Sequence, residues 1–75
     1  MNNYLIVTTK DSNGTYIDYI QLKYVESFYI LEDEERMFVY MRSGKQHHIS
    51  KKFSTCEQNK QIVRWEELPR IICNG

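Results

Sequence analysis

Glycine, proline and cysteine are scarce in this chain, and each shortage excludes a class of protein. The 75 residues include three glycines, one proline and two cysteines. The glycines stand apart at positions 14, 44 and 75, which excludes a glycine-rich phosphate loop. Apolar runs are only a few residues long, and the N-terminus lacks the pattern of a secretory signal. The sequence therefore predicts a folded cytoplasmic protein without a membrane segment.

Residues that could carry out chemistry are equally sparse. Cys56 and Cys73 are too few for a disulfide framework or a four-cysteine zinc site, and we expect both to be reduced thiols. His47 and His48 are adjacent, so on a strand they point to opposite faces and cannot share a metal ion. The acidic residues 32–35 lack the interleaved spacing of a calcium loop. We expect no enzymatic activity, no metal site and no cofactor.

Five runs rich in β-branched and aromatic residues predict a mainly β protein. These runs cover residues 4–9, 15–19, 24–31, 36–42 and 45–51. Turn sequences separate them, among them Asn13-Gly14, the acidic residues 32–35 and Ser43-Gly44. We expect a single domain over residues 1–75, in which five strands form an antiparallel meander that curls into a small open barrel or a bent sheet. A chain this short buries only about 60% of its unfolded surface, so it gains from oligomerisation.

The segment after Lys52 changes character and predicts a short C-terminal helix. Ser54 and Glu57 have the spacing of a capping box, which favours a helix over residues 55–62. Residues 61–65 either complete this helix or form a sixth strand. We expect Pro69 to end regular structure and residues 71–73 to pack back as an apolar tail.

Loop lengths predict how the central strands pair. A symmetric four-residue loop in the first hairpin places Leu31 opposite Arg36, Tyr29 opposite Phe38, and Phe28 opposite Val39. A two-residue Ser43-Gly44 loop in the second hairpin places Arg42 opposite Lys45, Tyr40 opposite His47, and Phe38 opposite Ile49.

This pairing gives the sheet two different faces. One face is uncharged, and we assign it to the core: Phe28, Ile30, Met37, Val39 and Met41. The other is aromatic and carries Tyr29, Leu31, Phe38, Tyr40, His47 and Ile49. The candidate binding residues are the rings of this second face and the basic residues around it: Tyr29, Arg36, Phe38, Tyr40, Arg42, Lys45, His47, Lys51 and Lys52. Two explanations stay open, because the face either binds a partner or is covered by the C-terminal segment or a second copy.

The zero net charge conceals a segregation along the chain. Residues 1–35 contain seven acidic and two basic residues, whereas residues 36–64 contain seven basic residues and one acid. Such an asymmetry can mark a basic binding surface. It is also explained if acidic and basic strands pair with each other within one sheet.

Several short segments resemble known bacterial families. The segments are Val7-Thr-Thr-Lys-Asp-Ser-Asn-Gly14, Val25-Glu-Ser27, Arg42-Ser-Gly-Lys45 and Ile49-Ser-Lys-Lys-Phe53. Their layout resembles the small flagellar FlbD-type proteins and similar short phage and bacterial β proteins. Residues 31–53 also resemble half of a LytTR DNA-binding sheet. Neither resemblance implies a catalytic residue, and both imply a small β fold.

The sequence thus predicts a small non-catalytic binding protein, encoded by a bacterium or a phage. We expect it to act through a protein–protein interface, as an adaptor, regulator or stoichiometric inhibitor. The alternative is a nucleic-acid-binding module, because single-stranded nucleic acid binds to aromatic rings that are surrounded by Lys and Arg. A homodimer is expected as well, because open edge strands invite pairing with another chain.

Overall fold

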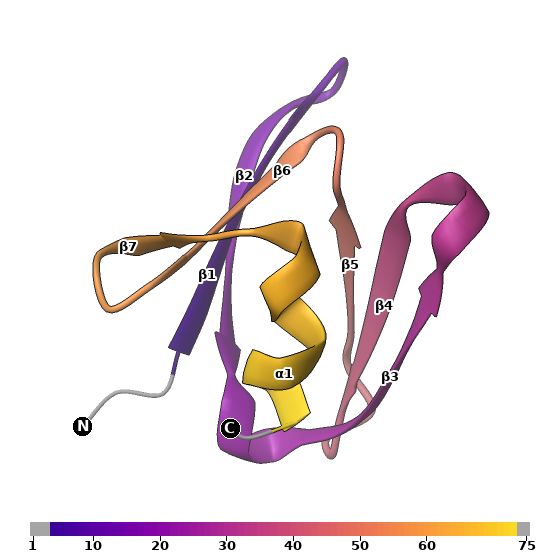
Figure 1. Ribbon diagram of the computed structural model, residues 1–75, viewed down its shortest axis with the longest axis vertical. Coiled ribbons are helices and arrows are strands. Elements are labelled where there is room, and N and C mark those ends of the chain that lie inside the picture. The colour runs from indigo at the N-terminus through magenta and orange to yellow at the C-terminus, as the bar shows by residue number, and fades with distance from the viewer. Residues whose placement is uncertain (1–3, 74–75) are drawn as a thin grey trace.

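The computed structural model describes residues 4–73, which form two antiparallel sheets and a short C-terminal helix (Figure 1). The strands are β1 (Tyr4–Asp11), β2 (Gly14–Gln21), β3 (Val25–Leu31), β4 (Arg36–Met41), β5 (Gln46–Ser50), β6 (Ser54–Gln58) and β7 (Gln61–Val63). Three short 3-10 helices, η1 (Leu22–Tyr24), η2 (Glu32–Glu34) and η3 (Trp65–Glu67), connect these elements, and α1 (Leu68–Cys73) follows η3. The predicted class, mainly β with a short C-terminal helix, is confirmed.

The strand arrangement differs from one continuous meander. Within residues 4–73, one sheet has the order β2-β1-β6-β7 and the other has the order β3-β4-β5. The chain leaves β2 through η1 and enters the second sheet, so β2 and β3 are consecutive without being paired. The two sheets stay separate and do not close into a barrel.

The pairing of the first central hairpin is confirmed. Tyr29 lies opposite Phe38, Phe28 opposite Val39, and Leu31 opposite Arg36. The loop is closed by η2 and by Glu35, which adopts a left-handed conformation with φ 53°. The four-residue loop therefore sets the register as its length predicts.

The pairing of the second hairpin is wrong by one residue. Tyr40 lies opposite Gln46 and Phe38 opposite His48, not opposite His47 and Ile49. The physical reason is a three-residue loop, Arg42-Ser43-Gly44, in which the Met41 N–H donates to the Lys45 carbonyl over 2.8 Å. Gly44 has φ 92°, a left-handed conformation that glycine supplies without steric cost.

The predicted helix over residues 55–62 is also wrong. Ser54 begins strand β6, and its hydroxyl is hydrogen-bonded to the Thr9 hydroxyl and accepts from the Ser50 N–H, at 2.8 and 3.0 Å. A tight turn at Asn59 and Lys60, both with positive φ, leads into β7. The alternative of a sixth strand in residues 61–65 therefore describes β7.

Pro69 lies inside the last helix instead of ending regular structure. It occupies the first turn of α1, where its missing N–H would have no intrahelical partner in any case. Leu68 and Ile72 lie one turn apart on the same side of α1, and both are buried. The expected apolar tail thus packs back against the protein as a helix.

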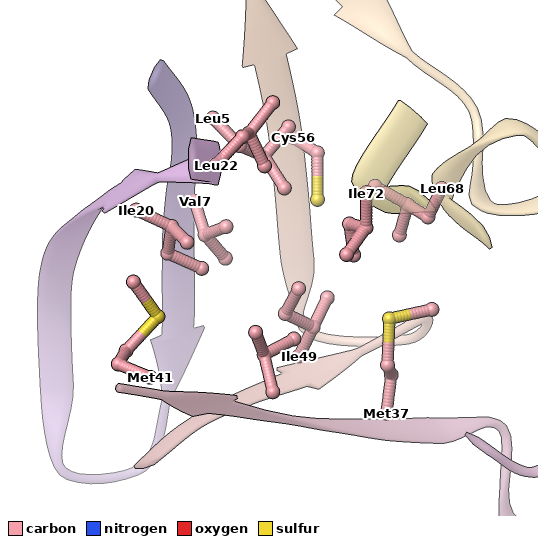
Figure 2. Packing of buried hydrophobic residues seen from close by; sticks show 11 residues of the cluster. Leu5, Val7, Ile20, Leu22, Met37, Met41, Ile49, Cys56, Leu68 and Ile72 are labelled. Carbon is pink, nitrogen blue, oxygen red and sulfur yellow. The ribbon is translucent and has the colours of Figure 1, made fainter. Parts of the chain in front are cut away.

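The core lies between the two sheets and is completed by α1 (Figure 2). Its buried apolar residues are Leu5, Val7, Ile20, Leu22, Met37, Val39, Met41, Ile49, Cys56, Leu68 and Ile72. Phe28 and Ile30 are half-buried and pack against this cluster, so the predicted core face of the second sheet is confirmed. None of the helices in residues 4–73 is long and apolar enough to cross a membrane.

Candidate binding face

The outer surface of the β3-β4-β5 sheet carries a connected group of aromatic side chains. Tyr29, Phe38 and His48 are direct neighbours across the three strands. Tyr40 lies two residues after Phe38 on β4, and therefore on the same surface. We call Tyr29, Phe38, Tyr40 and His48 the aromatic face. Met37 and Val39, which alternate with them on β4, point into the core.

The rings of the aromatic face stack on one another. The ring centroids of Phe38 lie 5.2 Å from Tyr29 and 4.8 Å from His48, with interplanar angles of 24° and 22°. Tyr29 also stacks with Tyr40, at 6.0 Å and 23°. Near-parallel rings this close overlap face to face, because two rings side by side in one plane would need more room. The central ring, Phe38, therefore has a neighbouring ring on the β3 side and another on the β5 side.

The aromatic face nevertheless remains open to solvent. Tyr29 is 45% exposed, His48 is exposed, and Phe38 and Tyr40 are half-buried. Helix α1 packs on the opposite side, where Leu68 and Ile72 join the core, and Trp65 packs against the same cluster. The explanation that the C-terminal segment covers the aromatic face is therefore wrong.

Hydroxyl groups add polar character to the aromatic face. The Tyr29 hydroxyl, as a hydrogen-bonding partner, raises the pKa of the Tyr40 phenol above its usual value. The Tyr40 phenol therefore stays protonated at neutral pH, and a tyrosine hydroxyl can donate or accept hydrogen bonds. The face combines apolar area with groups that can satisfy a polar partner.

The predicted basic border is only partly placed around the aromatic face. The Arg36 guanidinium lies over the Phe38 ring, 5.6 Å from its centroid, and is ion-paired with Glu34. Lys51 turns instead to Glu35 at 3.1 Å and Glu66 at 3.8 Å. The acidic loop and two of the basic residues thus neutralise each other at one end of the sheet, which accounts for part of the charge segregation.

The remaining predicted cations lie at exposed turns. Arg42 lies in the β4–β5 loop and Lys45 directly follows it, and the Arg42 N–H donates to the Tyr24 carbonyl at 2.9 Å. Lys52 lies beyond β5, with its ammonium 5.6 Å from the centroid of the Phe53 ring. Lys45 and Lys52 line the same cleft as Arg36, together with acidic side chains, so these cations do not form a patch of one charge.

His47 is not on the aromatic face, contrary to the prediction. It is buried on the inner side of β5, and its Nδ1 lies 3.8 Å from an Asp18 carboxylate oxygen on β2. Burial lowers the pKa of His47, with Lys45 adding to this effect and Asp18 opposing it. The residue that prediction missed is His48, and a three-residue loop in the second hairpin would have identified it.

A cleft of about 490 Å³ opens between the β1–β2 hairpin and β5, beside the aromatic face. Its lining mixes both signs of charge and includes Asp11, Asp18, Glu34, Arg36, Lys45 and Lys52. His47 and His48 both reach it. In residues 4–73, no group of three His, Cys, Asp or Glu side chains is close enough to hold a metal ion. Burial raises the pKa of the Cys56 thiol to about 11, so this sulfur is a poor nucleophile at neutral pH.

The comparisons with known proteins give no relative. No protein-family model matches the chain, and no curated protein or solved structure shows significant similarity to it. The resemblance to FlbD-type proteins and to the LytTR sheet therefore stays a prediction.

The buried His47 predicts that acid weakens the fold. An unfolded chain takes up a proton at this histidine near pH 6.5, whereas the folded chain resists protonation because its pKa is lowered. The contribution is therefore fully present above about pH 6.5 and is lost as the pH falls below it. We expect the free energy of unfolding, measured by urea titration between about pH 7.5 and 5, to fall with pH.

Variants of the two histidines divide this effect. His47→Gln should reduce the pH dependence, and His48→Gln should reduce it as well, because burial and the Arg36 cation also lower the pKa of His48. An unchanged pH dependence in His47→Gln would contradict the inward placement of this side chain.

Proposed function

We propose that this protein is a small non-catalytic binding protein whose aromatic face contacts another protein, as an adaptor or a stoichiometric inhibitor does. The observation that carries the proposal is the open stack of Tyr29, Phe38, Tyr40 and His48 outside the core. Contiguous aromatic area on the surface of a small domain is typical of interaction sites. Tyrosine in particular is enriched in protein–protein interfaces, because it offers a large apolar ring and a hydroxyl.

The stacking geometry supports a protein partner over a nucleic acid. A nucleobase stacks on a free ring face. Phe38, at the centre of the face, already has Tyr29 on the β3 side and His48 on the β5 side. The centre of the face then offers the edge of Phe38 with the hydroxyls of Tyr29 and Tyr40 beside it, and these suit side chains and backbone groups of a protein.

The charges favour the same partner. Phosphate binding depends on cations whose counterions are released when the polyanion arrives. Arg36 and Lys51 are instead paired with Glu34, Glu35 and Glu66. The acidic loop at this end of the sheet would also repel a phosphate backbone.

The test is affinity capture from extracts of the source cells with matched tyrosine variants, followed by quantitative mass spectrometry. Tyr29→Ala removes one ring of the aromatic face, and Tyr24→Ala removes a tyrosine of nearly equal exposure, 44% against 45%, outside it. We expect a protein that wild type and Tyr24→Ala both retain, and that Tyr29→Ala retains at least about tenfold less. Equal recovery with all three baits would overturn the proposal.

Direct titration with oligonucleotides tests the nucleic-acid alternative. The proposal expects no salt-sensitive binding at submicromolar concentration. If such binding occurs, Arg42→Ala/Lys45→Ala should reduce the slope of log affinity against log salt by about two. That result would replace the protein partner with a single-stranded nucleic acid.

A further inference from the structure

Strand β2 is an open sheet edge with little protection against pairing with another chain. It forms one edge of the β2-β1-β6-β7 sheet and pairs with β1 at all eight positions without a register shift. Natural proteins protect such edges with Lys, Pro, bulges or very short strands. The sequence of β2, Gly14-Thr-Tyr-Ile-Asp-Tyr-Ile-Gln21, contains neither Lys nor Pro.

The other sheet edges in the described part of the chain each have such a device. β3 has a register shift between Val25 and Ser27, with Glu26 at that point. β5 is flanked by Lys45 and by residues 51–52, which are both lysines. β7 is three residues long and lies between Lys60 and Arg64. Lysine, proline, a register shift and a short strand are therefore all missing at β2, whose single protective feature is the inward-pointing charge of Asp18.

The side chains of β2 also suit contact with another chain. Ile17 and Tyr19, on the outer surface, are 52% and 62% exposed. The one charged residue of the strand, Asp18, points to the opposite side, toward His47. The outward surface of β2 is therefore uncharged, with two exposed apolar side chains between Thr15 and Gln21.

The hydrogen-bond pattern indicates which backbone groups of β2 are open. The Lys10 N–H donates to the Phe53 carbonyl, so Lys10 bonds toward β6 and its neighbour Thr9 bonds toward β2. Thr9 lies opposite Tyr16, and hydrogen-bonded positions alternate along an antiparallel pair. Thr15, Ile17 and Tyr19 accordingly direct their N–H and C=O groups away from β1.

We propose that β2 pairs antiparallel with β2 of a second copy of this chain, with Ile17 opposite Ile17 of that copy. The two four-stranded sheets then continue into each other across a twofold axis. Pairing of β2 with its own copy brings one carboxylate from each chain to the interface, on a side chain that points inward, whereas pairing through the lysine-flanked β5 edge would bring several like charges together. The aromatic face lies on the other sheet and stays available to a partner.

The position of Asp18 disfavours one competing self-pairing, and the centre of the strand favours the proposed one, because it pairs Thr15, Ile17 and Tyr19 of both copies. With Ile17 opposite its own copy, Asp18 lies opposite Tyr16 of that copy, and Thr15 lies opposite Tyr19. A shift that placed Asp18 opposite itself would bring two carboxylates to one point of the ladder, which is destabilising. The proposed pairing uses the open backbone groups of Thr15, Ile17 and Tyr19 on both copies.

Cysteine cross-linking tests the register in the full chain. Cys73 is exposed and would first be replaced by serine, whereas the buried Cys56 can stay. Ile17→Cys should then form a disulfide-linked dimer under mild oxidation, because facing Cα atoms about 5.5 Å apart are within disulfide range. Thr15→Cys alone should not cross-link, because the two copies of Thr15 would be about 13 Å apart along the strands.

Two further cysteine variants make the test decisive. Thr15→Cys/Tyr19→Cys should restore cross-linking, since these positions face each other between copies. Cross-linking of Asp18→Cys with none of Ile17→Cys would overturn the proposed register.

Sedimentation tests the interface itself without a cross-link. Wild type should approach twice the 9.1 kDa mass of one chain at high micromolar concentration. Ile17→Lys should raise the dimer dissociation constant at least about tenfold, because lysine on an edge strand disfavours pairing with another chain. The variant should keep a cooperative melt, because Ile17 is exposed in the single chain. Tyr29→Ala should still dimerise. A monomeric wild type, a dimeric Ile17→Lys or a monomeric Tyr29→Ala would each overturn the proposal.

Discussion

Replacing Ile49 by alanine is expected to lower the free energy of unfolding by about 2–5 kcal/mol. Ile49 is 1% exposed and belongs to the cluster between the sheets (Figure 2). Truncation leaves a cavity that the rigid ladder between β4 and β5 cannot close, in addition to the lost burial. Because domains are stable by only about 5–15 kcal/mol, the loss should be obvious in urea titration.

The matched control is the neighbouring exposed position. His48→Ala removes a larger side chain from the outer surface and should cost less than about 1.5 kcal/mol, the upper value for a stacked aromatic pair. If His48→Ala destabilised the protein more than Ile49→Ala, the register of β5 described above would be contradicted.

This pair of variants also distinguishes the structure from what the sequence alone predicts. A two-residue loop places Ile49 on the aromatic surface, and a three-residue loop places it in the core. Ser43-Gly44 is compatible with both loops, because Gly44 tolerates a left-handed conformation in either. What decides is burial: only the longer loop directs Ile49 inward, opposite Met37. That information depends on packing against the β2-β1-β6-β7 sheet and is not local to the hairpin.

The pairing of the first hairpin could be predicted because two features of the sequence indicate the same register. The four-residue loop and the alternation of apolar residues on β3 and β4 give the same register, so Tyr29 and Phe38 are placed correctly on one surface. The stacking of Tyr29 on Phe38 follows from this pairing, whereas that of His48 depends on the second hairpin. The ion pair of Lys51 with Glu35 is missed because of the one-residue error in that second hairpin, since the predicted register continues to Lys51 opposite Arg36.

The error over residues 55–62 has a different cause. Ser54 and Glu57 have the spacing of a helix cap, but three-residue spacing of common residues carries little information. In the structure Ser54 faces Thr9 across the β1–β6 ladder, a partner 45 residues away in sequence. Tertiary pairing outweighs the local preference here, as it often does in small β proteins.

The C-terminal helix is the second place where a large effect is expected. α1 is only six residues long, too short to be stable by itself in water, so its contacts with the core hold it in place. In Figure 1 it lies between strands of the two sheets, and Leu68 and Ile72 are its buried residues. Met37 and Cys56, from different sheets, belong to the same cluster. α1 therefore serves as part of the core that joins the two sheets.

Leu68→Ala/Ile72→Ala is accordingly expected to remove more stability than a single buried leucine truncation, which costs about 2–5 kcal/mol. The two residues share a cavity, so their effects need not add. Thermal unfolding followed by circular dichroism should show a much lower midpoint or no cooperative transition. Arg70→Ala, on the exposed side of α1, should cost less than about 1 kcal/mol even though it removes an ion pair with Glu67. A double variant that melts like wild type would show that the sheets hold together without α1, and the core would then have to be redrawn without Leu68 and Ile72.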